Sequence, residues 1–181
     1  MPETDIQVRL LQRSDDRSVF RSGNVDLDRY FQRYAGQNQF RHHLGTTYVA
    51  VTAERICGFA TITPGELTVD SIPKSLRARL PAYPLPILRI SRLAVDERDQ
   101  GRGIGRLLLR AMFGLALDLR DRFGCTGVIV DAKPGAVGFY EGLGFMKLDV
   151  TSGDLGDRPG PIPMFLSVKE IARAVETRPR P

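Results

Sequence analysis

A short stretch rich in glycine and arginine follows an apolar run, and its residue types suit the binding of an anion. The stretch reads Gln100-Gly101-Arg102-Gly103-Ile104-Gly105. The apolar run at 87–95 predicts a strand, and the apolar periodicity over 103–123 predicts a helix. The first backbone N–H groups of a helix have no partner inside it, and the helix dipole adds positive potential there. We therefore expect this turn to bind the phosphate of a cofactor.

Two familiar phosphate-binding motifs do not fit this stretch. A dinucleotide fingerprint needs a third glycine at the position where Arg106 stands. A P-loop needs Gly-Lys-Ser or Gly-Lys-Thr, whereas Gly105 is followed by Arg106 and Leu107. The cofactor is therefore expected to be neither a dinucleotide in a Rossmann fold nor a nucleotide in a P-loop.

The order of the strands and helices that the sequence predicts around this turn indicates one mixed α/β domain over 1–175. Residues 176–181 are expected to form a disordered tail. A strand, a helix and one parallel crossover are expected over 87–130, with the right-handed connection that such units adopt. The proline-rich residues 81–86 are too rich in proline for regular structure and could form the wall of a cleft. The other expected elements are strands at 6–11, 46–52, 56–62, 128–130, 145–150 and 163–168, and helices from 26, at 73–80, at 136–143 and after 168.

The first helix is expected to be amphipathic and to begin just after Asn24, whose side chain is a good N-terminal cap. Its apolar side follows the spacing of a regular α-helix. The residues expected on that buried side are Leu27, Tyr30, Phe31, Tyr34 and Asn38.

Composition and charge describe an ordinary globular protein with an excess of arginine. The 181 residues carry a formal net charge of +5, and 22 of the 26 basic residues are arginines. This excess has two explanations that the sequence leaves open, a GC-rich genome or an anionic partner, since arginine suits phosphate contacts. The sequence shows neither a signal peptide nor an apolar run of the ~20 residues that span a bilayer.

The remaining titratable residues favour a cytoplasmic protein without a metal. Cys57 and Cys125 stand singly among apolar residues, so we expect two buried, reduced thiols. His42 and His43 are adjacent near the end of the first helix. Neighbouring helical side chains diverge by about 100°, so this pair suits the surface or a helix cap better than a metal.

The glycine-rich turn resembles that of the GNAT (Gcn5-related) N-acetyltransferase superfamily. Its pattern, Gln/Arg-x-x-Gly-x-Gly/Ala at the start of a long helix, is occupied by Gln100, Gly103 and Gly105. The segment VDAKPGAVGFYEGLGF at 130–145 and the order of elements over about 5–170 are also similar. The resemblance implies the GNAT acyl-CoA N-acyltransferase fold, a central mixed sheet with helices on both faces. It also implies acetyl-CoA as co-substrate and no metal.

The same resemblance implies a role for each part of the motif. Backbone N–H groups of the turn would hold the pyrophosphate of coenzyme A. The end of the preceding strand would pair with the pantetheine arm, and an N–H there would polarise the acetyl carbonyl. The residues implied for cofactor binding are Leu93, Ala94, Val95, Gln100, Gly101, Arg102, Gly103, Ile104, Gly105, Arg106 and Phe139.

Tyr140 is the implied catalytic residue. A tyrosine, with a reference pKa of about 10, suits protonation of a departing thiolate. From spacing alone, Tyr140 could equally be a packing residue of a short helix.

No general base stands out near the turn. Asp96, Glu97 and Asp99 are the nearest acids, and their place before the turn favours solvent-exposed positions. A lysine amine is neutral in only about 0.04% of molecules at pH 7, whereas an α-amine is neutral in on the order of 10%. Without a base, the α-amine is the better acceptor, with water carrying the proton away.

The N-terminal part is similar to the acetyltransferase toxins of bacterial toxin–antitoxin modules. The similar residues are Phe20-x-Ser-Gly, Leu27-Asp28-x-Tyr30 and Tyr34-Ala35-x-Gln37-Asn38. That resemblance implies aminoacyl-tRNA as acceptor, a ribbon-helix-helix antitoxin as partner, and leaves a homodimer open. The excess arginines would then contact the phosphates of the tRNA, and such contacts weaken as the salt concentration rises. The candidate contacts are Arg33, Arg41, Arg77, Arg79 and Arg92.

Two other functions stay open at this point. One is a GNAT enzyme that acetylates a small-molecule or protein amine, although the basic composition disfavours cationic substrates such as polyamines. The other is a non-catalytic acetyl-CoA-binding regulator, against which an intact Tyr140 argues.

Overall fold

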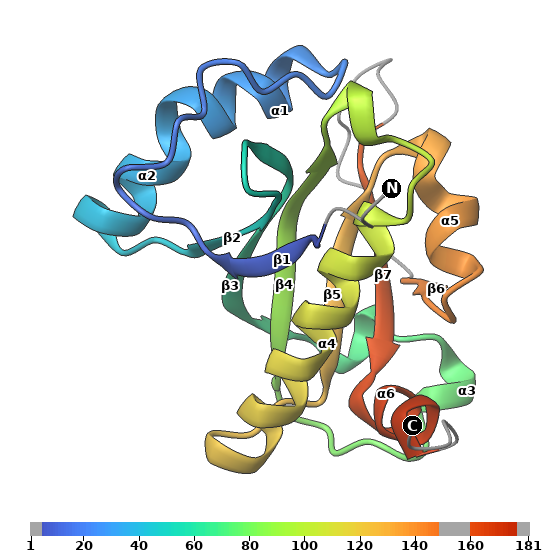
Figure 1. Cartoon of the computed structure of the whole chain (residues 1–181). Helices are drawn as coiled ribbons and strands as arrows, with labels where there is room; N and C mark the ends of the chain where they lie inside the picture. Colours follow the sequence, from blue (N-terminus) through green and yellow to red (C-terminus); the bar gives the residue numbers. More distant parts are fainter. Residues whose placement is uncertain (1–4, 149–159, 177–181) are drawn as a thin grey trace. The chain divides into compact units, whose positions relative to one another are not determined.

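The computed structural model of the chain describes residues 5–148 and 160–176, whose strands form one seven-stranded mixed sheet (Figure 1). Hydrogen-bonded neighbours follow the order β1-β2-β3-β4-β5-β7-β6. The strands are β1 (Gln7–Leu10), β2 (Thr46–Val51), β3 (Ile56–Leu67), β4 (Leu85–Val95), β5 (Gly127–Ala132), β6 (Met146–Lys147) and β7 (Ile162–Ser167).

The helices include long, short, 3-10 and π segments. The α-helices are α1 (Val25–Arg29), α2 (Ala35–Gln37), α3 (Lys74–Arg77), α4 (Ile104–Arg122), α5 (Val137–Glu141) and α6 (Val168–Glu176). Two π-helical turns, η1 (Tyr30–Tyr34) and η2 (Asn38–His42), continue α1 and α2. The 3-10 turns are η3 (Val69–Ser71), η4 (Glu97–Asp99) and η5 (Pro134–Ala136).

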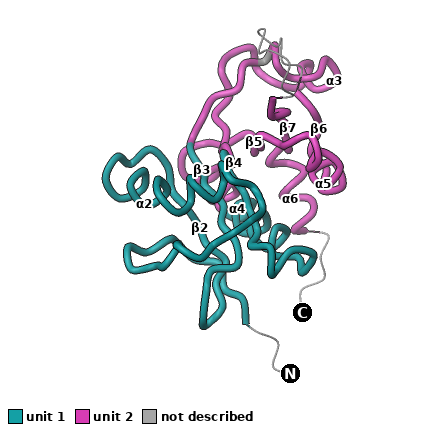
Figure 2. The backbone as a smooth tube through the Cα atoms, turned by 90° about the horizontal axis from the view of Figure 1, so that it is seen from above, with its two compact units in different colours: residues 1–63, 90–114 teal, residues 64–89, 115–181 magenta. Residues whose placement is uncertain are grey.

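The chain divides into two compact units, coloured teal and magenta in Figure 2. The first unit comprises residues 1–63 and 90–114, and the second comprises 64–89 and 115–181. Each unit is described by itself below. The single domain over 1–175 stays a prediction. Of the tail expected at 176–181, Glu176 is the last residue of α6, and 177–181 lie outside the described residues.

In the first unit, three antiparallel strands carry helices on both of their faces. β2 pairs with β1 and with β3, and Val49 lies opposite Phe59. The side of Gly58 faces α4, because a Cβ there would come within 3.0 Å of Ile104 and 3.1 Å of Leu108. Phe59 points to the opposite face, where its ring stacks on Phe31 with centroids 4.2 Å apart. This unit confirms the strands expected at 46–52 and 56–62, which form an antiparallel hairpin, and the helices expected on both faces.

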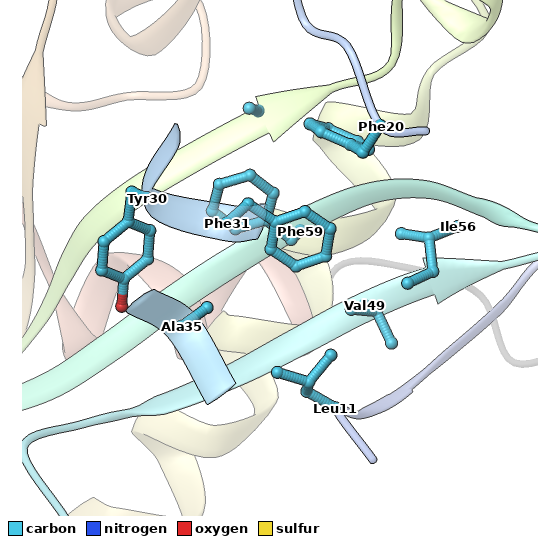
Figure 3. Packing of buried hydrophobic residues seen from close by; sticks show 9 residues of the cluster. Leu11, Phe20, Tyr30, Phe31, Ala35, Val49, Ile56 and Phe59 are labelled. Atoms are coloured by element: carbon cyan, nitrogen blue, oxygen red, sulfur yellow. The ribbon is translucent and has the colours of Figure 1, made fainter. Parts of the chain in front are cut away.

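Phe20, Phe31 and Phe59 form the centre of the first unit's core (Figure 3). The edge of the Phe20 ring meets Phe31 at 4.9 Å and Phe59 at 5.5 Å between centroids. Aromatic rings favour such edge-to-face and stacked arrangements. The cluster therefore anchors both the loop before α1 and the helix itself onto the sheet.

The first helix runs continuously from Val25 to His42, but the two π turns change its phase. It begins as expected, because the Asn24 side chain accepts a hydrogen bond from the Leu27 N–H at 3.0 Å. The Ala35 N–H then bonds to the Tyr30 carbonyl, five residues back. This wide turn moves the buried position from Tyr34, which is 47% exposed, to Ala35, which is fully buried. The expectation that Tyr34 is buried was wrong because it assumed regular α-helical spacing.

The second unit is held by β5, β7 and the residues packed on them. β5 and β7 are antiparallel from Gly127 opposite Ser167 to Ala132 opposite Ile162. Ile129 and Phe165 belong to an apolar core with residues from β3, β4 and the η3 region. A Cβ at residue 127 would overlap the Phe165 ring, so glycine allows these two strands to pair.

Several boundaries differ from the sequence prediction. β4 already begins at Leu85, inside the proline-rich segment, and the Pro86 carbonyl accepts hydrogen bonds from the Thr126 backbone and hydroxyl. Proline lacks an N–H but keeps its carbonyl, so Pro86 can still take part in the strand. The strand expected at 145–150 is described only as Met146–Lys147, and residues 149 and 150 lie outside the described residues.

The expectations for the thiols and the histidines are confirmed. Cys57 and Cys125 are buried and free. His42 and His43 are exposed, and His43 adopts φ 52° in the left-handed region that commonly ends a helix.

Candidate active site

The turn before α4 presents backbone N–H groups at the start of a 19-residue helix. Gly101 and Gly103 have φ values of +78° and +81°, which favour glycine, and a Cβ on either would meet nothing within 4 Å. The Leu107 N–H bonds to the Gly103 carbonyl at 3.0 Å. The N–H groups of 104–106 therefore precede the first turn's hydrogen bonds and are the donors that a helix start offers to an anion.

The buried side chain of Asp99 supports this turn through salt bridges. Its carboxylate is fully buried and forms salt bridges with Arg55 and, at 2.7 Å, with Arg102. Hydrogen bonds from the Arg55 side chain lower the pKa of Asp99, although its burial acts to raise it. The expectation that Asp99 lies in solvent was wrong, because two arginines from different segments satisfy its charge.

Asp96 is the second buried carboxylate near the turn, with 1% of its surface exposed. The Arg98 guanidinium donates to it at 2.7 and 3.0 Å, and the backbone N–H groups of Arg98 and Arg21 donate at 3.1 and 3.2 Å. Burial acts to raise the pKa of Asp96, but these hydrogen bonds outweigh it and lower the pKa to about 2. Asp96 was also expected in solvent, and it cannot accept a proton at neutral pH. Glu97 is exposed, as expected.

Gln100 fixes the turn to neighbouring backbone. Its side-chain amide donates to the Ser22 carbonyl at 2.9 Å and to the Val95 carbonyl at 3.1 Å. The motif glutamine therefore acts as a brace between the end of β4 and the loop before α1. Arg55, Asp96 and Asp99 complete this support, and only the charge pattern of Asp96-Glu97-Arg98-Asp99 hinted at it in the sequence.

The residues expected to face the pantetheine arm lie at the end of β4. Ala94 is 6% exposed and belongs to the apolar core, while Leu93 and Val95 are half-buried. Of the turn itself, Gly101, Arg102, Gly103 and Arg106 are exposed and Ile104 is buried. The exposed part of the turn is thus its backbone and its arginines.

Tyr140 lies in the second unit, on α5. It is 7% exposed, and its ring meets Phe139 at 5.2 Å and Phe145 at 5.5 Å, both edge-to-face. Burial raises the pKa of Tyr140 to about 12. Its hydroxyl keeps its proton at physiological pH, as an ordinary tyrosine also does, and the raised pKa makes it a weaker acid than a tyrosine in water. Phe139 is 36% exposed.

The five candidate arginines have different surroundings. Arg92 lies over the Tyr30 ring, 3.7 Å from its centroid. Arg77 donates to the carbonyls of Ile72 at 2.7 Å and Asp70 at 2.6 Å. Arg33, Arg41 and Arg79 are exposed. Arg77 and Arg92 thus have structural partners within their own units, whereas the other three are exposed.

The described residues contain neither a metal-binding cluster nor a membrane-spanning helix. Over residues 5–148 and 160–176, no group of three or more His, Cys, Asp or Glu side chains could hold a metal ion. In the same part of the chain, every helix is too short or too polar to cross a bilayer.

Residues 43–147, more than half of the chain, match the Acetyltransferase (GNAT) domain family. The chain belongs to this family. A tRNA-acetylating toxin of Mycobacterium tuberculosis (strain ATCC 25618 / H37Rv) is 34% identical to this GNAT protein over 126 residues, which cover 68% of this chain and 74% of the toxin. The predicted fold class and enzyme class are thereby confirmed.

Solved structures of AtaT share the fold of this GNAT protein. AtaT complexed with acetyl-methionyl-tRNAfMet has a TM-score of 0.81 at 21% identity, over 94% of this chain and 99% of the other. A tyrosine-to-phenylalanine variant of AtaT, bound to acetyl-CoA and the C-terminus of the antitoxin AtaR, has a TM-score of 0.75 at 19% identity, over 96% and 99% of the two chains. The roles of individual residues stay predictions.

Proposed function

We propose that this chain is an acetyl-CoA-dependent toxin that acetylates the α-amine of aminoacyl-tRNA and thereby blocks translation. The observation that carries the proposal is the similarity to the mycobacterial tRNA-acetylating toxin over two thirds of the chain. The AtaT complex with acetyl-methionyl-tRNAfMet supports the same acceptor, and AtaT bound to acetyl-CoA supports the donor. This activity places the protein in the cytoplasm, where charged tRNA is found.

The donor half of the site is assigned to the first unit. Backbone N–H groups over 102–106 were expected to bind the pyrophosphate, but the Arg102 N–H bonds to the Asp99 carbonyl at 3.3 Å. The N–H groups of 104–106 therefore bind it, and exposed Arg106 adds positive charge, whereas the Arg102 charge is paired with Asp99. The end of β4, at Leu93, Ala94 and Val95, pairs with the pantetheine arm, and a backbone N–H there polarises the acetyl carbonyl. Asp99 and Gln100 act as positioning residues, because their hydrogen bonds hold the backbone of the turn.

Acyl transfer then requires that the amine attacks the acetyl carbonyl and that the coenzyme A thiolate leaves. The neutral α-amine attacks the carbonyl carbon, the carbon–sulfur bond breaks, and the thiolate takes the proton of the Tyr140 hydroxyl. The new amide releases its extra proton to water, from which Tyr140 is reprotonated. The low pKa of Asp96 and the lowered pKa of Asp99 leave both unsuited as general bases, which favours an amine that is partly neutral at pH 7.

The experiment that tests the acceptor is transfer of labelled acetyl from acetyl-CoA. Charged tRNA, deacylated tRNA and a lysine-rich ribosomal protein are offered in parallel, together with a polyamine. We expect label only on charged tRNA. Label on the protein or the polyamine would support a GNAT enzyme of another substrate class, and binding of acetyl-CoA without any transfer would support a regulator.

Tyr140→Phe tests the proton donor. A general acid contributes about 10²- to 10⁴-fold, so kcat should fall by that factor while the Kd for acetyl-CoA stays unchanged. Tyr83→Phe is the matched control, because Tyr83 is 67% exposed. If the Tyr140→Phe enzyme turns over at the wild-type rate, Tyr140 is a packing residue.

We further propose that a small ribbon-helix-helix antitoxin neutralises the toxin and that the toxin is a homodimer. The complex of AtaT with the C-terminus of the antitoxin AtaR supports an antitoxin partner, whereas the ribbon-helix-helix type and the homodimer rest on the resemblance of the sequence to acetyltransferase toxins. Light scattering of the purified protein measures its mass directly, and a neighbouring gene for a short ribbon-helix-helix protein supplies the partner to test. A monomer at micromolar concentration would contradict the homodimer.

A further inference from the structure

A basic pocket lies in the first unit, between the loop after β1 and the helix that continues through η2. It has a volume of about 330 Å³ and is lined by Arg13, Arg17, Gly36, Gln37, Phe40 and Arg41. We call these six residues the arginine pocket. Three of the six are arginines and none is acidic, so the pocket carries a local charge of +3.

The nearby acids are occupied elsewhere. Asp15 forms a salt bridge with Arg9 at 2.8 Å, and Asp16 accepts hydrogen bonds from the backbone and hydroxyl of Ser18. Within residues 5–148 and 160–176, the salt bridges include none of the three arginines of the arginine pocket. The hydrogen bond from Arg9 does most to lower the pKa of Asp15, and electrostatic attraction between Asp15 and Arg17 contributes to this lowering. Among the described residues, however, no carboxylate pairs directly with the three guanidinium groups, so they can still bind an anionic ligand.

Arg17 is the residue that most requires an explanation. Its Nε and Nη1 atoms are buried and have no hydrogen-bond partner in the described structure. Leaving buried charged donors unsatisfied is unfavourable, so such groups in a folded protein indicate a missing partner. An anion between Arg17 and the other two arginines would satisfy them.

The helix is shaped to admit the Arg17 side chain. A Cβ at residue 36 would lie 2.5 Å from Nη1 and 2.9 Å from Nη2 of Arg17, so only glycine allows the guanidinium to lie against the helix backbone. Gly36 lies between the π turns η1 and η2, and such turns are frequent at functional sites. On the other side, the Arg13 guanidinium lies 4.6 Å from the centroid of the Phe40 ring.

We propose that the arginine pocket binds a phosphodiester of the RNA acceptor, a proposal that rests on the proposed function. Arginines reach this pocket from the loop after β1 and from the end of the helix, and a tetrahedral phosphate offers oxygens in several directions. A planar carboxylate of an acidic peptide offers only two oxygens in one plane. The volume exceeds that of a lone phosphate group, which leaves room for the attached ribose.

The test measures tRNA affinity for wild type, Arg17→Gln and Gly36→Ala at several salt concentrations. A hydrogen bond to a charged group is worth about 10- to 100-fold in binding, and we expect a loss of that size for Arg17→Gln. The slope of log affinity against log salt should become shallower by about 0.7–0.9 for each phosphate that the variant no longer neutralises. Gly36→Ala keeps all three arginines but displaces Arg17, so it should weaken binding without removing a charge.

Arg120→Gln is the charge-matched control, because Arg120 is exposed, pairs with Asp121 and lies outside the arginine pocket. It should change tRNA affinity less than twofold. Thermal melting separates binding from folding. Arg17→Gln should leave Tm unchanged or raise it, since it removes unsatisfied buried donors. A large fall in Tm would instead make Arg17 a structural residue.

Two further measurements distinguish an RNA phosphodiester from free phosphate and from an acidic peptide as the ligand of the arginine pocket. Inorganic phosphate that protects against melting in wild type but not in Arg17→Gln, without any change in tRNA affinity between the two, would make this a free-phosphate site and overturn the proposal. An acidic peptide that binds the pocket and is not displaced by tRNA would overturn it too. Failure of the proposed function is distinguishable, because it shows as no acetyl transfer to charged tRNA by the wild-type enzyme.

Discussion

The first unit contains two places suited to a phosphate, and they are built in different ways. At the start of α4 the donors are backbone N–H groups, and the nearby Arg55, Arg98 and Arg102 are paired with buried carboxylates. In the arginine pocket the donors are side chains, and no acid lines it. A backbone site has a fixed shape and suits one cofactor, whereas side-chain charge suits a polyanion whose binding weakens with salt.

The largest effect should follow from removing the carboxylate beneath the glycine turn. Asp99→Asn leaves Arg55 and Arg102 without their common partner, which should lower the free energy of unfolding by about 3 kcal/mol. Acetyl-CoA affinity should fall while tRNA affinity does not, as measured by calorimetry for each ligand. Asp121→Asn removes an exposed carboxylate and should cost less than about 1 kcal/mol. Equal losses for the two ligands would break the distinction between the two places.

The second test is the stability of the turn in acid. The pKa of Asp96 is lowered to about 2 in the folded protein, below its ordinary value of 3.8. Unfolding therefore becomes easier as the pH falls from 3.8 towards 2, because the unfolded chain binds the proton first. The loss should reach about 2 kcal/mol. Denaturant titrations over this range should show it, and Asp96→Asn should remove this part of the pH dependence. A pH dependence that Asp96→Asn does not alter contradicts the role given to Asp96.

The smallest effects on the free energy of unfolding should come from two glycine-to-alanine substitutions, for which we expect opposite signs. Gly103→Ala forces a side chain into the left-handed region and should cost about 1–2 kcal/mol, with weaker acetyl-CoA binding. Gly114→Ala lies inside α4, where a Cβ also meets nothing within 4 Å, and should stabilise by about 1 kcal/mol. Thermal melting of each variant measures whether its stability rises or falls. A stabilising Gly103→Ala would show that the turn does not depend on its backbone conformation.

The glycine turn could be predicted from the sequence because its backbone conformation depends on neighbouring residues. Gly101 and Gly103 adopt the positive φ values that a tight turn before a helix requires, and the N-cap at Asn24 was predictable for the same reason. The family's motif also located Tyr140, although no sequence pattern predicts the burial that raises its pKa.

The remaining features depend on residues that are distant in the chain. Asp99 is buried because Arg55, 44 positions earlier, reaches it. The π turn at Tyr30 shifts the buried face from Tyr34 to Ala35, which regular periodicity cannot indicate. The arginine pocket combines residues of this shifted helix with Arg13 and Arg17 of the preceding loop, so it forms only when the chain folds.

The most direct test of the central claim is the chemical position of the transferred acetyl group. Charged tRNA is incubated with acetyl-CoA and the protein, digested with nuclease, and the aminoacyl-adenosine is analysed by mass spectrometry. We predict one acetyl group on the α-nitrogen of the amino acid, formed by wild type and lost with Tyr140→Phe. An unmodified aminoacyl-adenosine from the wild-type reaction would contradict the account.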